Sequence, residues 1–253
     1  MITPKRIARV FSKLRRRLAV AWRVWQGFDD ALARSRTKPS FSQCGEDMIV
    51  WFLLDHVGIR RPSYIDIGAH HPTHLSNTAL FYLLGGRGIN IEPDPQLFRE
   101  FVTGRKQDIN LNIGIGGKPG ELIFHRMADP SLSTFSADEA VRMESVEGIA
   151  IVERLPLPVC TINEVMQTHR LLPDFVSVDV EGNDLEILQS FDFKAHRPAV
   201  FCVETISFSL SNAGRKNVEI MAFLARQGYE VYADTYINTI FVDRQRFSDA
   251  KVV

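Results

Sequence analysis

Three residues, Asp66, Gly68 and Glu92, have the types and the spacing of a nucleoside-binding site. Asp66 and Gly68 lie at the end of one predicted strand, and Glu92 lies at the end of the next. A glycine after the first strand lets the backbone approach a ligand closely. An acidic residue at the end of the second strand can accept hydrogen bonds from both ribose hydroxyls. Together, in this order, the three residues predict a nucleoside cofactor.

The loop after the first strand indicates which cofactor this is. A dinucleotide site has the pattern G-x-G-x-x-G, which lets a helix N-terminus approach the pyrophosphate. Here residues 68–73 read GAHHPT and contain only the first glycine. A pyrophosphate would meet side chains and a proline, whereas S-adenosyl-L-methionine has no phosphate. The loop therefore favours this donor and methyl transfer, with Asp108 and Asn110, at the start of the third strand, expected on the adenine side.

A second acidic group follows the fourth predicted strand and comprises Asp179, Glu181 and Asp184, while Glu204 ends the fifth. Carboxylates that meet at one edge of a sheet can orient the amine of the methionine moiety, act as a base, or hold a divalent metal. We expect Asp179 to bind the cofactor and Glu181 to act in catalysis. Asp184 is expected to start the next helix, where its charge favours the helix dipole, with a plain helix cap as the alternative. A metal is a separate hypothesis, and no metal ligand is assigned.

Histidines crowd the first loop, at positions 70, 71 and 74. His70 and His74 follow Glu181 as candidates for the base that helps to deprotonate an acceptor hydroxyl, and ordinary loop packing is the alternative. Pro72 argues against a helical zinc site at these residues. Residues 133–135 (Ser-Thr-Phe) are candidates for acceptor contacts, or for a polar loop tip.

Strands and helices alternate from residue 41 onwards, and this order positions the candidate residues. The predicted strands are 64–67, 88–92, 109–115, 175–179, 199–204, 229–234 and 239–243, and the predicted helices are 43–57, 77–84, 95–105, 184–190 and 216–227. Alternation predicts an α/β fold with a doubly wound, mostly parallel, Rossmann-like sheet. The last two strands are separated by four residues, which permits only a hairpin. An antiparallel last strand is typical of the seven-stranded methyltransferase fold.

Residues 120–161 interrupt the alternation and are interpreted as an insertion over the carboxyl edge of the sheet, where such folds bind ligands. A strand over 121–126 and a short helix over 139–146 are expected within it. The methyltransferase domain is then residues 41–253, preceded by a separate segment, residues 1–40.

Charge and composition separate that segment from the rest. The chain of 253 residues has 30 basic and 30 acidic side chains and is 45% hydrophobic, which excludes a disordered or disulfide-stapled protein. Residues 1–38 alone hold eleven basic and two acidic side chains, interleaved with apolar residues every three or four positions. This pattern predicts an amphipathic helix, followed by a linker, that either packs on a protein surface or contacts an anionic membrane. No nucleic-acid module is recognised.

Three scattered cysteines favour a reducing compartment, and no apolar run reaches the length of a membrane span. We therefore expect a cytoplasmic protein, with peripheral contact to the inner membrane through residues 1–38.

Several short runs resemble the FkbM family of S-adenosyl-L-methionine-dependent methyltransferases. These runs are FSQCGED (41–47), YIDIGAHHP (64–72), LSNT (75–78), GINIEP (88–93), LSTF (132–135) and DVEG (179–182). The resemblance implies the seven-stranded fold and O-methylation of a sugar in a polysaccharide, glycolipid or secondary metabolite. One such activity is 2-O-methylation of a fucosyl residue on a lipo-chitooligosaccharide nodulation signal.

By position, Asp66 and Gly68 match the cofactor loop of the family, Glu92 its ribose acid, and Asp179 and Glu181 the motif after the fourth strand. Two alternatives remain open from the sequence. A nucleotide-sugar oxidoreductase that uses NAD has the same strand–loop–acid layout. A glycan-biosynthesis scaffold could bind the cofactor without turnover.

Overall fold

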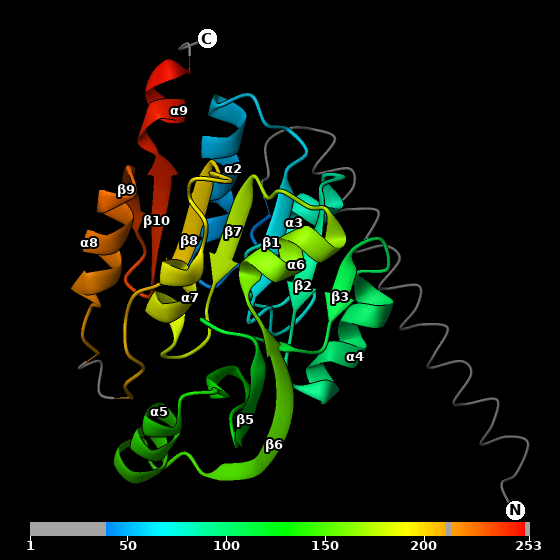
Figure 1. Ribbon diagram of the computed structural model, residues 1–253, viewed down its shortest axis with the longest axis vertical. Helices are drawn as coiled ribbons and strands as arrows, with labels where there is room; N and C mark the ends of the chain where they lie inside the picture. Colours follow the sequence, from blue (N-terminus) through cyan, green and yellow to red (C-terminus); the bar gives the residue numbers. More distant parts are fainter. Residues whose placement is uncertain (1–38, 211–213, 251–253) are drawn as a thin grey trace, which may run out of the picture. The chain divides into compact units, whose positions relative to one another are not determined.

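Seven strands form the central sheet in the order β3-β2-β1-β7-β8-β10-β9 (Figure 1). The computed structural model describes residues 39–210 and 214–250. The strands of this sheet are β1 (Ser63–Ile67), β2 (Arg87–Ile91), β3 (Ile109–Leu111), β7 (Phe175–Val178), β8 (Val200–Glu204), β9 (Tyr229–Asp234) and β10 (Asn238–Asp243). Pairing is parallel from β3 through β8, whereas β10 is antiparallel to both β8 and β9. The predicted fold with its antiparallel last strand is confirmed.

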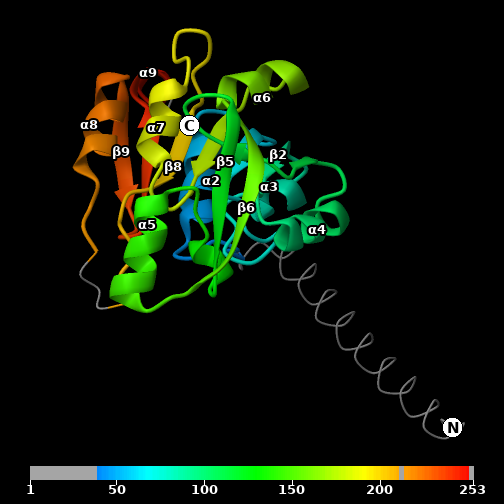
Figure 2. The same ribbon diagram turned by 60° about the horizontal axis from the view of Figure 1, so that its bottom comes forward.

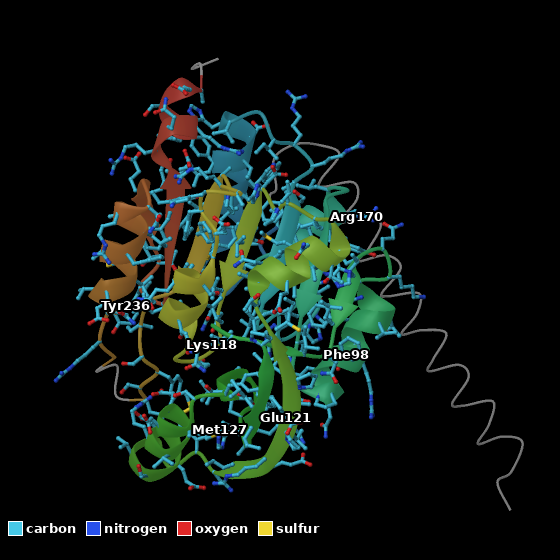
Figure 3. The ribbon with its side chains drawn as sticks, in the orientation of Figure 1. Phe98, Lys118, Glu121, Met127, Arg170 and Tyr236 are labelled. Atoms are coloured by element: carbon cyan, nitrogen blue, oxygen red, sulfur yellow. The ribbon has the colours of Figure 1, made fainter. Side chains whose placement is uncertain are left out.

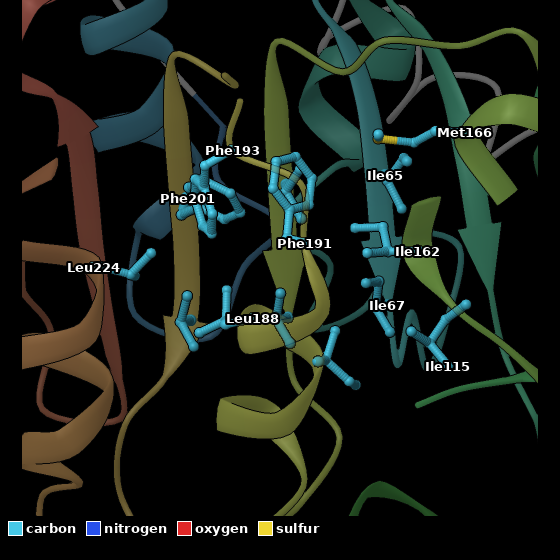
Figure 4. Packing of buried hydrophobic residues seen from close by; sticks show 14 of the residues in the cluster. Ile65, Ile67, Ile115, Ile162, Met166, Leu188, Phe191, Phe193, Phe201 and Leu224 are labelled. Atoms are coloured by element: carbon cyan, nitrogen blue, oxygen red, sulfur yellow. The ribbon is translucent and has the colours of Figure 1, made fainter. Parts of the chain in front are cut away.

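Helices cover both faces of this sheet. They are α2 (Glu46–His56), α3 (Ala79–Leu83), α4 (Pro95–Gly104), α6 (Ile162–His169), α7 (Asp184–Ser190), α8 (Val218–Arg226) and α9 (Arg244–Asp249). Side chains of α6, α7 and α8 share one apolar cluster with β1, β7 and β8, and part of that cluster is shown in Figure 4. Side chains of α2 and α3 share a second cluster with the opposite face of the same strands. The sheet is therefore the middle of three layers.

A small second sheet with its own helix contains most of the predicted insertion and begins at residue 114, before the expected start at residue 120. It has the order β4-β6-β5, formed by β4 (Gly114–Ile115), β5 (Gly120–Met127) and β6 (Ile151–Cys160). Between β5 and β6 lie the turn η1 (Pro130–Leu132), the helix α5 (Ala137–Arg142) and the π-helical turn η2 (Met143–Glu147). Figures 1 and 2 show β5, β6 and α5 together at one end of the central sheet.

Three parts of the prediction needed correction. The strand expected over 109–115 is split into β3 and β4, which belong to different sheets. At the break, the Asn112 side chain donates to the backbone oxygens of Glu92 and Pro93, at 2.9 and 2.8 Å, and this holds the chain as it leaves β3. The strand β6 and the helices α6 and α9 were not predicted. The helix expected from residue 43 begins only at Glu46, after Gly45 in a left-handed conformation.

Residues from Ser40 onward form one compact unit. The amphipathic helix and linker expected over residues 1–40 lie, apart from the last two residues, outside the described part of the chain. Within the described residues, no helix is both long enough and apolar enough to cross a membrane.

Candidate active site

A cavity of about 350 Å³ lies where the parallel strands end and the insertion begins. Its walls come from the segments after β1, β2, β7 and β8, and from the insertion. Nine residues were given catalytic or cofactor-binding roles from the sequence, and six of them line it: Asp66, Gly68, His70, Glu92, Asp179 and Glu181. The other three, His74, Asp108 and Asn110, are not part of its lining.

Gly68 is the point at which the first loop meets the loop after β7. Its φ is +75°, and a Cβ atom there would lie 1.7 Å from the backbone oxygen of Asp179. The backbone N–H of Gly68 donates to Ile91 at 3.1 Å, and that of Asp179 donates to Ile67 at 3.0 Å. Only glycine fits this conformation and this close approach, as the turn was expected to require.

Glu92, which is expected from the sequence to accept hydrogen bonds from a ribose, lines the cavity. Its carboxylate accepts hydrogen bonds from the backbone N–H groups of His70 and Asp94, both at 2.7 Å, and the residue is only 5% exposed. Burial raises its pKa to about 8 in spite of these two bonds. Each carboxylate oxygen keeps a second lone pair. Both oxygens can therefore also accept from the two hydroxyls of a ribose.

Asp66 is held from behind by a relay of hydrogen bonds. The hydroxyl of Thr78 donates to its Oδ2 at 2.6 Å, and Nη2 of Arg105 donates to that hydroxyl at 3.2 Å. Burial raises the pKa of Asp66, and Thr78 and Arg105 oppose this rise. The relay directs the hydroxyl proton toward Asp66 and leaves its carboxylate as an acceptor at the cavity wall.

Asp108 and Asn110 belong to a buried polar network behind the sheet edge, not to the adenine side of the cavity. Asp108 precedes β3 and accepts from Tyr64 at 2.8 Å and from Arg105 at 3.3 Å. Asn110 accepts from Asn90 at 2.9 Å. The guanidinium of Arg105 is 1% exposed, and a buried cation needs such a carboxylate partner. Asp108 precedes β3 and so lies away from the carboxyl edge of the sheet. Asn110 is level with Asn90 and Asp66 in the sheet register, but its side chain is bonded to Asn90 and to the backbone oxygen of Arg105.

Three carboxylates converge at the other end of the cavity. One oxygen each from Asp179, Glu181 and Glu204 lies within 4.8 Å of the others. Burial, followed by repulsion from Asp184, raises the pKa of Asp179 to about 7. Burial, followed by repulsion from the other carboxylates, also raises the pKa of Glu181 and of Glu204. Such a cluster can share protons among its members, hold an amine, move a proton or bind a divalent cation.

The loop that carries Glu181 has an unusual backbone. Glu181 has a φ of +54°, and Gly182 follows with +115°. Asp184 accepts from the N–H groups of Val180 and Gly182, both at 3.2 Å, and burial raises its pKa to about 6. Asp184 is the first residue of helix α7, as expected, and its side chain also holds the preceding loop.

The two candidate histidines have different positions. His70 lines the cavity, and burial, followed by the charges of His71 and His74, lowers its pKa. His74 is exposed outside the lining, and its backbone N–H donates to Nδ1 of His71 at 2.9 Å. The structure therefore places His70 at the cavity and His74 outside its lining, although the neighbouring Leu75 and Asn77 line the cavity again.

Several lining residues were not among the predicted site residues. They are Gln43 before α2, Asn77 and Ser177, residues 206–209 after β8, and Tyr236 between β9 and β10. Figure 3 shows Tyr236 at the end of the central sheet that faces the insertion, where Glu121 and Met127 also lie. The signal for Gln43 and Asn77 was present in the runs FSQCGED and LSNT. For Tyr236, the signal was the hairpin turn itself, which returns the chain to the ligand edge.

The lining fits the expected cofactor. Ile91, Ile113 and Phe124 provide apolar walls in the same cavity as Glu92, as an adenosine requires. The carboxylates at the other end match the positive charge of a sulfonium and an amine. The lining therefore suits an adenosine at the Glu92 end and a methionine moiety at the carboxylate end.

Comparison with solved structures finds distant similarity to methyltransferases. A 1,6-didemethyltoxoflavin-N1-methyltransferase from Burkholderia thailandensis, with bound S-adenosylhomocysteine, is 11% identical; the match covers 96% of this chain and 89% of that one, with a TM-score of 0.39. An O-methyltransferase from Bacillus cereus in complex with SAH is also 11% identical, with 83% and 84% covered and a TM-score of 0.39. A precorrin-6Y C5,15-methyltransferase from Geobacter metallireducens is 13% identical, with 77% and 87% covered and a TM-score of 0.39.

At these TM-scores the three similarities carry no argument of their own. No curated protein matches the chain. The model of the methyltransferase FkbM domain, in contrast, matches residues 66–231, about two thirds of the sequence. This range begins at Asp66 and includes Glu92, Asp179 and Glu181. The chain therefore belongs to the FkbM family of methyltransferases, and its cofactor is S-adenosyl-L-methionine.

Proposed function

We propose that this protein transfers the methyl group of S-adenosyl-L-methionine to a hydroxyl oxygen of a sugar, in a glycan or a glycolipid. The observation that carries the proposal is the cluster of Asp179, Glu181 and Glu204 at the end of the cavity that suits a methionine moiety. Transfer to oxygen needs a group that takes the hydroxyl proton, and an ionised carboxylate that other carboxylates crowd is a strong proton acceptor.

The walls around this cluster support a polyhydroxylated acceptor. Ser131, Ser133 and Ser207 add hydroxyl groups to the lining, and Phe135 and Phe208 add aromatic surface. Hydroxyls can exchange hydrogen bonds with a sugar, and aromatic rings cover its apolar C–H face. The fucosyl residue of a lipo-chitooligosaccharide, methylated at its 2-oxygen, is our specific candidate within this class.

The cofactor, when bound, supplies a methyl group that its sulfonium already activates. The residues of the chain bind the two substrates, align them and take up the proton. Glu181 accepts the proton of the acceptor hydroxyl, with His70 as the second candidate. Asp179 orients the methionine amine, and the walls hold the acceptor oxygen in line with the transferred carbon. Such alignment can supply effective molarities of about 10⁵ to 10⁸ M.

Transfer of isotope-labelled methyl from S-adenosyl-L-methionine to purified glycans and glycolipids tests the proposal. We expect a product that is one methylene heavier in a sugar residue, formed by the unaltered protein and lost in Glu181→Gln. Label in protein, RNA or an amine but in no sugar would contradict the sugar acceptor. No label in any acceptor would support the scaffold alternative.

We also propose that the basic segment places the enzyme at anionic membrane, where lipid-linked glycans are built. Residues 15–17 are consecutive arginines, and each basic residue near an anionic surface contributes about 1 kcal/mol. Flotation with anionic liposomes tests this idea. We expect the unaltered chain to float and a variant with Arg15→Glu, Arg16→Glu and Arg17→Glu to remain at the bottom; equal flotation of both would contradict it.

A further inference from the structure

Thr134 lies between Ser133 and Phe135 in the sequence, but its side chain has a different environment from theirs. Ser133 and Phe135 line the cavity, whereas Thr134 does not. Thr134 is 1% exposed, and its hydroxyl donates to the backbone oxygen of Glu181 at 2.7 Å. Residues 133–135, which the sequence suggested for acceptor contacts, therefore include one residue that instead contacts the loop after β7, the Glu181 loop.

Thr134 is itself tied firmly to the insertion. Its backbone N–H donates to His125 at 3.1 Å, and its backbone oxygen accepts from His125 at 2.8 Å, which bridges it to β5. Its hydroxyl oxygen also accepts from the N–H of Ser136 at 2.9 Å, just before α5. This hydroxyl donates to the loop after β7 and accepts from the insertion. Thr134 is therefore a link between two segments and not a contact to the methyl acceptor.

The loop that carries Glu181 has a strained backbone that its neighbours must stabilise. Glu181 is a non-glycine residue with a φ of +54°, a conformation that persists only where the surroundings fix it. Asp184 holds the N–H groups on either side of Glu181, at Val180 and Gly182. Thr134 holds the carbonyl of Glu181 from the side of the insertion. The two residues together fix the peptide groups around Glu181 and thereby the direction of its side chain toward the cavity.

We propose that Thr134 is a positioning residue through which the insertion holds the Glu181 loop in its active conformation. The inference rests on the proposed role of Glu181 as the base. Loss of the Thr134 hydroxyl should loosen the loop and misplace the carboxylate. Cofactor affinity should stay close to normal, because Asp66 and Glu92 come from other strands and the backbone of Asp179 stays bonded to Ile67 at 3.0 Å.

Three variants separate the hydroxyl from the bulk of the side chain. Thr134→Val keeps the shape and removes the hydroxyl, and Thr134→Ser keeps the hydroxyl. Ser133→Ala removes the neighbouring hydroxyl, which accepts from Met127 on the insertion and does not bond to the loop. Thr134→Ala replaces the valine variant if valine prevents folding.

Hydrogen–deuterium exchange of residues 179–184 is the primary measurement. We expect exchange about tenfold faster in Thr134→Val than in the unaltered protein, as for the loss of one buried hydrogen bond, with normal rates in Thr134→Ser and in Ser133→Ala. Normal exchange in Thr134→Val, or equally fast exchange in Thr134→Ser, would overturn the proposal.

Two functional measurements complete the test. In Thr134→Val we expect S-adenosyl-L-methionine affinity, by calorimetry, to stay within about twofold, and the rate of labelled methyl transfer to a glycolipid extract to fall about tenfold or more. A fall in affinity with an unchanged rate would also overturn the proposal. If the unaltered protein labels no sugar, the proposed function fails, while the exchange measurement still decides whether Thr134 holds the loop.

Discussion

Replacing Glu92 by glutamine tests the cofactor site at its best-defined group. Both carboxylate oxygens of Glu92 already accept a backbone N–H, from His70 and Asp94. Glutamine has only one oxygen, so it cannot keep both of these bonds and also accept from both ribose hydroxyls. A hydrogen bond to a charged acceptor contributes about 1.5–3 kcal/mol, so loss of one such bond should weaken S-adenosyl-L-methionine binding about 10- to 150-fold.

The pH dependence of the same variant gives an independent check. Burial raises the pKa of Glu92 to about 8, and ribose hydroxyls favour the ionised carboxylate. Cofactor binding must therefore release a proton below about pH 8, and affinity should rise with pH by up to about tenfold per unit. The glutamine variant lacks this contribution. The ratio of the two affinities should therefore grow between about pH 6 and pH 8.

The free energy of unfolding of the cofactor-free protein should fall as the pH rises, whereas cofactor affinity should increase. The pKa of Glu92 rises from 4.5 to about 8 on folding. The stability that belongs to the protonated carboxyl is fully present below pH 4.5 and is lost as the pH rises through about 8. At complete ionisation the loss is at most about 5 kcal/mol. Thermal melting of the unaltered protein should fall over this range more steeply than that of Glu92→Gln.

Isothermal titration calorimetry at several pH values measures the affinity effect. The matched control is Glu100→Gln, because Glu100 is an exposed carboxylate on α4 that pairs with His71 at 3.2 Å. We expect normal affinity in this control. Affinity in Glu92→Gln within twofold of normal at pH 8, or a ratio that does not change with pH, would refute the assignment of Glu92 to the ribose.

Three further predictions concern other parts of the site. Gly68→Ala should abolish cofactor binding in calorimetry and lower the melting temperature, because its Cβ would overlap the backbone oxygen of Asp179 at 1.7 Å; normal binding would contradict the close approach. Asp108→Asn should destabilise the protein by about 3 kcal/mol in urea unfolding, because it removes the partner of the buried Arg105, with cofactor affinity in the folded variant close to normal; a large loss of affinity would return Asp108 to the adenine side. Activity should survive exhaustive EDTA treatment, since Glu181 acting as a base needs no metal; a loss that Mg²⁺ restores would assign the carboxylate cluster to a cation.

The sequence was sufficient for the mostly parallel sheet with its antiparallel last strand and for the ends of the parallel strands. Asp66, Gly68 and Glu92 could be placed because the carboxyl ends of parallel strands share one edge, whatever packs above them. The final hairpin followed from the length of its link alone. These inferences depend only on chain connectivity, which the sequence states directly.

Other features depended on partners that the sequence does not show. Strand β6 contains Pro156 and Pro158, which argue against a strand. The prolines are tolerated because no strand pairs with them on the side of β6 that faces β4. On that side β4 pairs only with Val159 and Cys160, so the missing N–H groups of the prolines break no strand pairing. Asp108 resembled a ligand residue because nothing in the sequence shows that Arg105 is buried beside it.

Helix α6 could have been recognised. Thr161 and Glu164 form a reciprocal capping box at its start, with the Thr161 hydroxyl accepting from the N–H of Glu164 at 3.2 Å. The role of Thr134, in contrast, was not accessible from the sequence. It depends on a contact between residues 47 positions apart.

The most direct test of the account is transfer of deuterated methyl from S-adenosyl-L-methionine to defined fucosylated oligosaccharides, followed by mass spectrometry of the separated sugars. Glu181→Gln is the comparison, because its side chain keeps its size and loses its basicity. We predict label on a sugar oxygen with the unaltered protein and a strongly reduced rate with Glu181→Gln at equal cofactor occupancy. Label on a sugar at an undiminished rate in Glu181→Gln would contradict the role of the carboxylate, and label confined to nitrogen or carbon would contradict sugar O-methylation itself.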